Sequence, residues 1–394
     1  MGGIRPSTMQ LETLFIALMV PPLCAALFNA YGAVRSIRGL PRVPEDTGAT
    51  APVRLSIIVP ACNEAADIQA ATRAKLDTDH PDVELVIVED RSTDSTPAIA
   101  DALAASDPRV RVLHVRELPA GWLGKVHALQ RGVAEASGDW LLFSDADVHI
   151  AKSLLRRILV DAEARELEFV SAVPHVTSNG FCVDVLMSSF LRMLVVGGRL
   201  WNVGDPASRA AAGGGVFNLV RRDAFLRTKG FEWLKLEVAD DVCMAQMCKR
   251  AGLKSEVYVS EEISLAFYES VGGIMGGLEK NAFALFKFRA GLVAVVCVLC
   301  LWLELGPLLG LLLPGPARWV ALAALLGTGA AQVAVARWTG RRFLPAAVPV
   351  IGATLLILFL VRASLLTLWR GGIFWRGTRY ALEELRGGSR IEHL

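Results

Sequence analysis

The sequence predicts an α/β domain with a doubly wound, mainly parallel sheet, together with long apolar helices at both ends of the chain. From residue 54 to residue 143, short apolar runs of strand length alternate with stretches of helix length. Consecutive strand–helix–strand units of this kind build parallel sheets covered by helices on both faces. The flanking apolar stretches have about the 20 residues that a helix needs to cross a bilayer.

Composition indicates an integral membrane protein. Hydrophobic residues make up 53% of the 394, more than an ordinary soluble domain carries, and 41 basic residues balance 39 acidic ones. A nucleic-acid-binding protein would show a basic excess or stripe, so we expect no nucleic-acid partner. The seven cysteines are scattered and form no disulfide or zinc framework, which fits a reducing, cytoplasmic environment.

The periodicity of apolar residues places the individual elements of the α/β region. Strands are predicted at residues 55–59, 84–88, 110–115, 140–143, 168–173 and 215–220, and helices at 63–76, 95–104, 123–136 and 240–250.

We expect four parts along the chain: a membrane anchor and linker (1–53), the α/β domain with interfacial helices (54–290), a transmembrane region (291–369) and a basic tail (370–394). The first apolar stretch, 14–34, is followed by Arg35, Arg38 and Arg42. The positive-inside rule therefore places the α/β domain on the cytoplasmic face, which is the inner membrane if the protein is bacterial. A cleaved signal peptide is the competing interpretation, but its basic residues would precede the apolar core.

The apolar stretches 292–313, 319–335 and 344–368 predict three further membrane helices. Three crossings would place the C-terminus outside, whereas its arginines favour the inside. Pro345, Pro349 and Arg362 make the last stretch the best candidate for a re-entrant or interfacial piece, since an arginine at mid-membrane depth costs about 2.5–3.5 kcal/mol on insertion scales.

Two further stretches, 181–201 and 278–289, are apolar or amphipathic but look too short to span. They are predicted to lie at the membrane interface. An ordinary core-facing helix is the alternative for the first of them.

Two carboxylates follow the predicted strand 140–143 at once. On an extended backbone Asp145 and Asp147 point the same way, at the strand end where open α/β sheets bind ligands. Such a pair suits Mg²⁺ or Mn²⁺ that bridges to a diphosphate, although a D-x-D alone is often a solvated turn. His149 either supplies a nitrogen near this metal or is a plain surface histidine.

The first two strands end in polar motifs. Pro60, Asn63 and Glu64 follow the first strand, and Asp90 ends the second, where it would accept a hydrogen bond from a base ring N–H. Asp94 is expected to cap the next helix.

Three other groups belong to the candidate site. Lys125 closes Gly-Trp-Leu-Gly-Lys at a predicted helix start, where free N–H groups suit a diphosphate. Gly214, in Ala-Gly-Gly-Gly, either lets a ligand approach the backbone or forms a turn with no function. Asp240 and Asp241 begin the last predicted helix. Asp240 suits capping, and Asp241 would either take a proton from an attacking hydroxyl or cap the helix as well.

The whole motif set closely resembles family 2 glycosyltransferases of the GT-A fold. It consists of P-A-C-N-E, V-E-D-R-S-T-D-S-T, G-W-L-G-K-V-H-A-L, F-S-D-A-D, A-G-G-G and A-D-D-V, in this order. The flanking apolar segments resemble the membrane-bound branch that includes ceramide glucosyltransferases and hopanoid-associated glycosyltransferases. No Q-x-x-R-W motif follows the last acids, which favours a single transfer over polymer synthesis.

The resemblance implies an inverting, metal-assisted transfer of one sugar from a nucleotide sugar, usually a UDP-sugar, to a membrane lipid. The acceptor would be a sphingolipid, a hopanoid, diacylglycerol or, as an alternative, polyprenyl phosphate. Asp90 would contact the nucleobase, Lys125 the base or diphosphate, Asp147 the metal, and Asp241 would be the general base, with Asp145 near the donor. A non-catalytic nucleotide-sugar-binding membrane protein and a transporter are the competing hypotheses.

Overall fold

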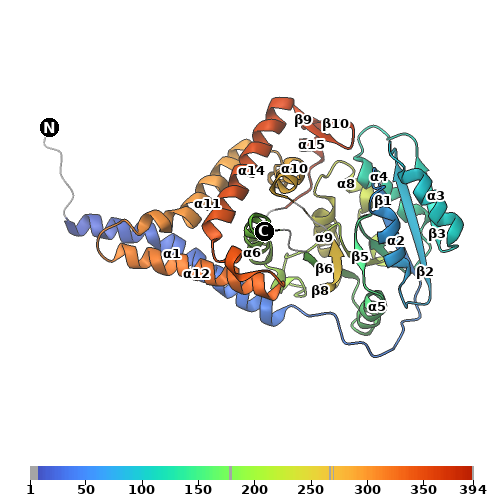
Figure 1. Cartoon of the computed structure of the whole chain (residues 1–394), viewed down its shortest axis with the longest axis horizontal. Helices are drawn as coiled ribbons and strands as arrows, with labels where there is room; N and C mark the ends of the chain where they lie inside the picture. Colours follow the sequence, from blue (N-terminus) through green and yellow to red (C-terminus); the bar gives the residue numbers. More distant parts are fainter. Residues whose placement is uncertain (1–7, 177–179, 266–267, 269, 393–394) are drawn as a thin grey trace. The chain divides into compact units, whose positions relative to one another are not determined.

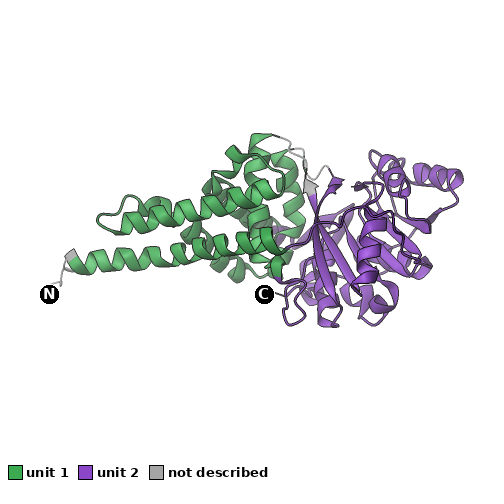
Figure 2. Ribbon diagram, turned by 90° about the horizontal axis from the view of Figure 1, so that it is seen from below, with its two compact units in different colours: residues 1–39, 178–201, 268–366 green, residues 40–177, 202–267, 367–394 purple. Residues whose placement is uncertain are grey.

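The computed structural model describes residues 8–176, 180–265, 268 and 270–392. These residues form two compact units, and each unit consists of three separate segments of the chain (Figures 1 and 2). The helical unit, unit 1, comprises Met1–Gly39, Ser178–Trp201 and Tyr268–Leu366. The α/β unit, unit 2, comprises Leu40–Thr177, Asn202–Phe267 and Thr367–Leu394. The C-terminal tail therefore belongs to the compact α/β unit, and residues 178–201 and 268–290 do not.

An eight-stranded mixed sheet organises unit 2, in the order β3-β2-β1-β4-β7-β6-β8-β5. Strands β1 to β4 pair in parallel, β7 runs antiparallel between β4 and β6, β6 pairs in parallel with β8, and the short β5 pairs antiparallel with β8. The predicted α/β fold with a mainly parallel sheet is confirmed. The strands are β1 (Leu55–Ala61), β2 (Val83–Asp90), β3 (Val110–Val115), β4 (Trp140–Phe143), β5 (His149–Ile150), β6 (Phe169–Val176), β7 (Asn218–Arg221) and β8 (Ser255–Leu265).

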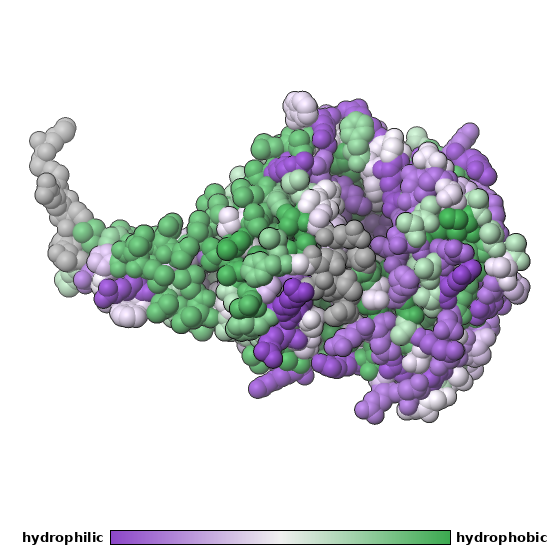
Figure 3. Space-filling view, in the orientation of Figure 1, coloured by the Kyte–Doolittle hydropathy of each residue, from purple (hydrophilic) through white to green (hydrophobic). Residues whose placement is uncertain are grey.

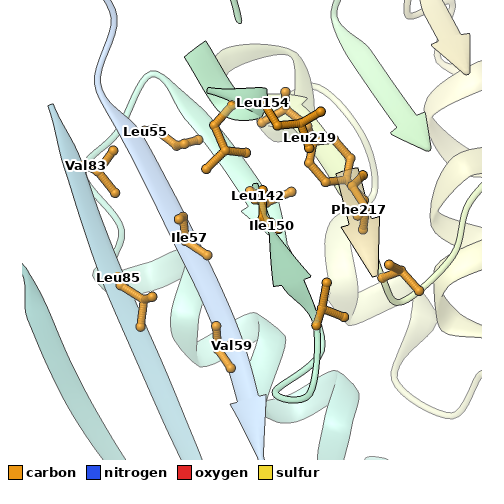
Figure 4. Packing of buried hydrophobic residues seen from close by; sticks show 14 of the residues in the cluster. Leu55, Ile57, Val59, Val83, Leu85, Leu142, Ile150, Leu154, Phe217 and Leu219 are labelled. Carbon is orange, nitrogen blue, oxygen red and sulfur yellow. The ribbon is translucent and has the colours of Figure 1, made fainter. Parts of the chain in front are cut away.

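The sheet core is built from alternating residues of the central strands. Leu55, Ile57 and Val59 of β1 point to one face, beside Leu142 of β4 and Leu85 of β2 (Figure 4). Both faces are buried, because helices cover them, so the strands read as continuous apolar runs rather than alternating ones. This rigid sheet fixes where the loops after β1, β2 and β4 begin.

The helices of unit 2 are α2 (Ile68–Leu76), α3 (Thr96–Ser106), α4 (Gly124–Glu135), α5 (Leu154–Ala164), α7 (Arg222–Leu226), α8 (Gly230–Leu234), α9 (Asp240–Arg250) and α15 (Leu382–Gly388). Four of them were predicted, and α3, α4 and α9 lie within two residues of their predicted bounds. The exception is α2, which begins five residues later than predicted because Asn63 adopts a left-handed conformation with φ of 57°. The unpredicted elements are strands β5 and β8, helices α5, α7, α8 and α15, and the hairpin of β9 (Gly372–Trp375) and β10 (Thr378–Ala381).

Unit 1 consists of α1 (Thr8–Gly39), α6 (Phe181–Arg192) with its π-helical continuation (Met193–Gly197) and a 3₁₀ turn (Leu200–Asn202), α10 (Val271–Asn281), a further 3₁₀ turn (Ala284–Phe286), α11 (Ala290–Gly310), α12 (Ala317–Trp338), α13 (Phe343–Ala346) and α14 (Pro349–Arg370). Five helical stretches in the described part of the chain are long and apolar enough to cross a membrane. Figure 3 shows hydrophobic residues covering much of the face of this unit.

Two membrane expectations need correction. The stretch 181–201 was expected to be too short to span, but the helical run Phe181–Asn202 has sufficient length and hydropathy because the π-helical and 3₁₀ turns extend α6. The stretch 344–368 is not one helix. It breaks between α13 and α14, directly before Pro349, whose ring favours a helix start over a helix interior.

Small residues bring α1, α11 and α12 into close contact. A Cβ atom on Gly310 of α11 would lie 2.5 Å from the sulfur of Met19 and 2.8 Å from Ala321, and one on Gly327 of α12 would lie 3.2 Å from Ala26. Later residues of α1 thus meet later residues of α12, so these two helices run in the same direction. Close backbone approach at small residues is the usual packing of membrane helices.

Charged side chains inside unit 1 pair with one another. Arg192 of α6 is almost fully buried and donates to Glu304 of α11 at 2.6 Å, to Asn29 of α1 at 2.9 Å and to Gln332 of α12 at 3.1 Å. Buried Asp184 accepts from Arg341 at 3.0 Å. Buried charges are tolerated when they are paired and hydrogen-bonded in this way.

The packing of α4 on the sheet makes a first prediction. A Cβ on Gly132 would lie 2.4 Å from Cγ2 of Ile58, so Gly132→Ala should lower the free energy of unfolding by about 1–3 kcal/mol through overpacking. In Gly387→Ala of α15 the added methyl group would meet no atom within 4 Å, so this substitution should be neutral or should raise the free energy of unfolding by up to about 1 kcal/mol. Denaturant unfolding of both variants in detergent measures the difference; equal stability of the two would contradict the packing.

Candidate functional site

The loops after β1 and β2 are tied together by their polar side chains. The amide of Glu64 donates to Thr96 Oγ1 at 2.8 Å, and the amide of Ala65 donates to Asp94 Oδ2 at 3.1 Å. In return, Thr93 donates its amide to Asn63 Oδ1 at 2.8 Å. Asp94 also accepts from Thr96 N at 2.9 Å, but the N-cap position of α3 is occupied by Ser95 and not by Asp94, as was expected. Much of the Ser-Thr-Asp-Ser-Thr motif thus serves to hold the two strand-end loops side by side.

Asp90 ends β2 and is buried. Both of its carboxylate oxygens accept from Arg91, at 2.8 and 3.0 Å. The start of α4 lies so close that a Cβ on Gly124 would come within 2.3 Å of Asp90 Oδ2. The glycine in Gly-Lys is therefore required by the approach of α4 to this carboxylate.

Lys125 reaches from the first turn of α4 to the end of β4. Its ammonium lies 2.8 Å from Asp145 Oδ1 and 4.0 Å from Asp240 Oδ2. Burial lowers the pKa of Lys125, but the carboxylates of Asp145, Asp240 and Asp241 outweigh this effect and raise it well above the usual lysine value. The lysine is a permanent cation among three acids.

The Asp-Ala-Asp segment is a turn rather than the extended continuation of β4 that was expected. The strand ends at Phe143, Ala146 and Asp147 form a turn, and Val148 N donates to Asp145 O at 3.4 Å. Burial raises the pKa of Asp147, and the charge of Asp145 raises it further. The two carboxylates are thus close enough to repel each other, even though the backbone between them is bent.

Lys75 supports this turn from below. It is 1% exposed, and its ammonium donates to the carbonyls of Val148 at 2.6 Å and Asp145 at 3.1 Å. Burial lowers the pKa of Lys75 to about 8, although Asp147 and Asp145 counteract the shift. The sequence pattern does not single out this lysine, which lies in helix α2, far before the Asp-Ala-Asp motif in the chain.

The glycine-rich segment before β7 joins Asp145 to Asp241. Gly215 N donates to Asp241 Oδ2 at 2.7 Å, while Gly215 O accepts from Asp145 N at 2.8 Å. A Cβ on Gly215 would lie 2.4 Å from Asp145 Oδ2 and 2.9 Å from Lys125 Nζ. A Cβ on Gly214 would meet no atom within 4 Å, and the amide of Gly214 donates to Asn218 Oδ1 at 3.2 Å.

These groups line one pocket in unit 2. Its wall contains six polar residues from four segments of the chain, together with glycine and apolar residues: Pro60, Lys125, Leu129, Phe143, Ser144, Asp145, Gly215, Asn218, Phe231, Asp240, Asp241 and Met244. The pocket brings together the predicted residues Pro60, Lys125, Asp145 and Asp241. The other predicted residues, Asn63, Glu64, Asp90, Asp147, His149 and Gly214, are not part of its wall.

The residues around Asp145 and Asp147 fit a divalent cation only as a partial ligand set. In the described part of the chain, no three His, Cys, Asp or Glu side chains are grouped to hold a metal ion, so His149, which lies in β5, does not form such a group with the two acids. A pair of mutually repelling carboxylates nevertheless suits Mg²⁺ or Mn²⁺, which commonly binds one or two carboxylates and takes its other ligands from phosphate and water.

The C-terminal hairpin β9–β10 contributes residues that sequence reasoning missed. Arg376 at its tip pairs with Glu64, Thr378 accepts from Arg91 at 3.3 Å, and the hydroxyl of Tyr380 accepts from Gly124 N at 3.2 Å. The hairpin thus touches three of the predicted nucleotide-sugar motifs. Arg376 and Gly377 both have positive φ, as the two central residues of a tight hairpin turn do. The sequence signal for this hairpin is the pair Arg-Gly between aromatic and β-branched residues.

Comparison with known proteins agrees with this geometry. Residues 56–248 match the family model "Glycosyl transferase family 2". This part of the chain belongs to glycosyltransferase family 2. The match spans β1 to α9 and includes every predicted site residue.

Two curated relatives and one solved structure illustrate the likeness. The chain is 33% identical over 137 residues to a beta-monoglucosyldiacylglycerol synthase of Synechocystis, covering 32% of this chain and 28% of that one. It is 25% identical over 211 residues to a 4,4'-diaponeurosporenoate glycosyltransferase of Staphylococcus aureus, covering 52% and 53%. The alignments thus span about a quarter and a half of these relatives.

The fold is also that of a mannosyltransferase of Pyrobaculum calidifontis, solved in complex with GDP-Man and Mn²⁺. The TM-score is 0.57 at 20% identity, over 91% of this chain and 99% of the other. At this identity the likeness establishes the GT-A-like fold with its long apolar helices. The ceramide and hopanoid branch suggested by the sequence is not singled out by these comparisons.

The low pKa of Lys75 predicts a pH dependence of stability. Its native pKa of about 8 lies below the ordinary 10.5, so between these values the native state has released a proton that the unfolded chain still holds. The free energy of unfolding should therefore rise with pH across this interval, by up to about 3 kcal/mol. Below pH 8 the lysine is charged in both states, and its contribution is flat.

Unfolding of the wild type and of Lys75→Met, compared from pH 7 to pH 10, tests this. The wild type should gain stability relative to the variant as the pH rises above 8. Parallel curves over the whole range would contradict the assignment.

Proposed function

We propose that the protein transfers one sugar, with inversion, from a nucleotide sugar to a membrane lipid. The observation that carries the proposal is the shared pocket of Lys125, Asp145 and Asp241 within a family 2 domain. A cation beside a helix N-terminus suits the donor's diphosphate, and an acid in the same pocket suits the acceptor's hydroxyl. A UDP-sugar is the first donor to test.

Asp241 is the group that would remove the proton of the acceptor. One oxygen accepts from Gly215 N at 2.7 Å and the other from Val242 N at 2.8 Å, so backbone amides fix the carboxylate in the pocket. A base held in one orientation takes a proton as the hydroxyl attacks the anomeric carbon. The adjacent Asp240 is buried and faces Lys125, so the two neighbouring acids have different surroundings.

Lys125 and the Asp145–Asp147 turn form the donor side. The ammonium would neutralise charge on the departing diphosphate, while Asp90 beyond the start of α4 would meet the nucleobase. Mg²⁺ or Mn²⁺ held by Asp147 and Asp145 would add Lewis-acid stabilisation of the leaving diphosphate. Because a diphosphate leaves as an anion, no second carboxylic acid is needed to protonate it, unlike in glycoside hydrolysis.

A lipid acceptor is supported by the long apolar helices and by the relatives. One relative is named a beta-monoglucosyldiacylglycerol synthase, and the other is named a 4,4'-diaponeurosporenoate glycosyltransferase. The candidate acceptors are diacylglycerol, sphingolipids, hopanoids and polyprenyl phosphate.

A screen tests the proposed reaction. It combines each acceptor with UDP- and GDP-sugars in native membranes, follows release of nucleoside diphosphate, and identifies new glycolipid by mass spectrometry.

Two substitutions at the pocket sharpen this test. Asp241→Asn keeps the shape but removes the base, so kcat/KM should fall by at least about 100-fold. Gly215→Ala would push Asp145 and Lys125 apart, and a displacement of about 1 Å can cost about 100-fold as well.

Matched controls are Asp223→Asn at the exposed start of α7 and Gly387→Ala in α15, which adds a methyl group in open space. Both should keep activity close to that of the wild type. Full activity of Asp241→Asn would rule out the base role. Nucleotide-sugar binding without release of nucleoside diphosphate for any acceptor would favour a non-catalytic binding protein.

A further inference from the structure

The C-terminal tail is an integral part of the α/β unit. Gln246 of α9 exchanges two hydrogen bonds with the backbone of Glu392, at 2.8 and 2.9 Å. Glu237 accepts from the amides of Arg390 and Ile391, and the side chains of Leu385 and Ile391 are buried. Residues 367–392 are therefore on the same side of any membrane as the rest of unit 2.

This constrains how often the chain crosses the bilayer. A compact body lies on one side, so each stretch that leaves unit 2 and returns to it must cross an even number of times. Ser178–Trp201 has the length of about one crossing, which needs about 20 residues, and so it makes none. Tyr268–Leu366 contains the three long helices α11, α12 and α14, of which two at most can cross.

Packing within unit 1 identifies the crossing pair. Helices α11 and α12 are joined by the short loop 311–316 and pack against each other and against α1. A Cβ on Gly315 in that loop would lie 3.3 Å from Glu12, near the start of α1. The first turns of α1 and the α11–α12 loop are thus at one end of a three-helix bundle, and the ends of α1 and α12 at the other.

Helix α14 has different neighbours. Its Gly352 packs on Ser189 and Val185 of the buried helix α6, and its Arg362 pairs with Glu279 of α10 at 2.7 Å. Ile351, Leu358 and Leu365 are spaced by seven residues, and each is more than half exposed, so they form one apolar stripe along the helix. At the end of this stripe, Trp369 is 82% exposed.

We propose that α14 lies in the plane of the membrane interface, with its stripe Ile351–Leu358–Leu365 and Trp369 in contact with lipid, while α1, α11 and α12 cross. Helix α14 starts after the end of α12 and finishes in unit 2, so both of its ends are on one side of the membrane. An apolar stripe with a terminal tryptophan is typical of helices at the lipid interface. The Arg362–Glu279 pair then lies at the surface, where an arginine does not have to enter the hydrocarbon.

The distribution of basic residues indicates on which side of the membrane unit 2 and the C-terminal tail lie. The end of the bundle at which the chain passes from α1 into unit 2 carries a cluster of arginines and lysines: Arg35, Arg38, Lys287, Arg289, Arg337, Arg341 and Arg342. The opposite end has Arg318, with Arg5 preceding α1 in the sequence. The positive-inside rule therefore places unit 2 and the tail in the cytoplasm, and the conflict between three crossings and an arginine-rich C-terminus disappears.

One consequence concerns the candidate site. The chain passes from the end of α14 at Arg370 through Gly371 directly into the hairpin β9–β10, whose Arg376, Thr378 and Tyr380 contact the loops after β1 and β2 and the start of α4. A helix fixed in the leaflet is thus continuous with a hairpin that contacts three of the motifs predicted to bind the nucleotide sugar. The membrane arrangement itself does not rest on the proposed function.

Spin labels measure the depth of α14 in lipid directly. Ile351→Cys, Leu358→Cys and Leu365→Cys are labelled one at a time in the full-length protein in vesicles, in a background where the exposed Cys24 and Cys182 are alanine. Collision with oxygen and with a water-soluble nickel chelate gives the depth of each label. An in-plane helix gives three equal, shallow depths.

A spanning helix would instead change depth by about 10 Å at each seven-residue step. Leu11→Cys and Leu18→Cys on α1 provide that pattern as a control, because both are exposed and α1 crosses. Protease protection of a C-terminal tag in vesicles of known orientation is the second measurement: the tag should be on the side of unit 2. Depths that increase stepwise along α14, or a tag on the opposite side, would overturn the proposal.

Discussion

The backbone of Gly215 is the constraint on which the site depends. Its N–H donates to Asp241 and its carbonyl accepts from the amide of Asp145, so one residue links the acid after β4 to the acid at the start of α9. Lys125 can lie beside Asp145 only because position 215 has no side chain. The antiparallel pairing of β7 with β4 brings this glycine to the end of β4, which gives the mixed sheet its functional importance.

Charge organisation follows from that geometry. Asp145, Asp147, Asp240 and Asp241 gather around two lysines, one in the pocket and one buried beneath the turn. Asp147 keeps a raised pKa because it is buried and faces the charge of Asp145. A divalent cation would reduce the repulsion that remains between Asp145 and Asp147, and phosphate and water would supply its other ligands. The protein side of the site is thus electrostatically incomplete without its donor.

Much of the fold was predictable from local pattern, since β3 and α9 have their predicted bounds and the motifs after β1, β2 and β4 do lie at one edge of the sheet. The pocket residues Lys125, Asp145 and Asp241 were also found, because strand ends and helix starts are visible in sequence. What failed depends on contacts distant in sequence. Lys75 looks like a surface residue of a helix, and the hairpin residues Arg376 and Tyr380 are more than 250 positions from their partners at Glu64 and Gly124. The bend at Asp145–Asp147 was missed because a local pattern does not reveal the lysine that stabilises it.

The membrane helices show the same limit of sequence reasoning. Hydropathy identifies α6 and α14 as long and apolar, but only their connections to a compact α/β unit restrict which helices cross. The central claim, that this acidic cluster grips a metal-bound diphosphate, is tested most directly by calorimetric titration of UDP and GDP into the purified protein, with Mn²⁺ and after its removal by chelation. We expect binding of one of the two nucleotides that weakens at least tenfold when the metal is removed and in Lys125→Met. Equal affinity with and without metal, and in the variant, would contradict the account.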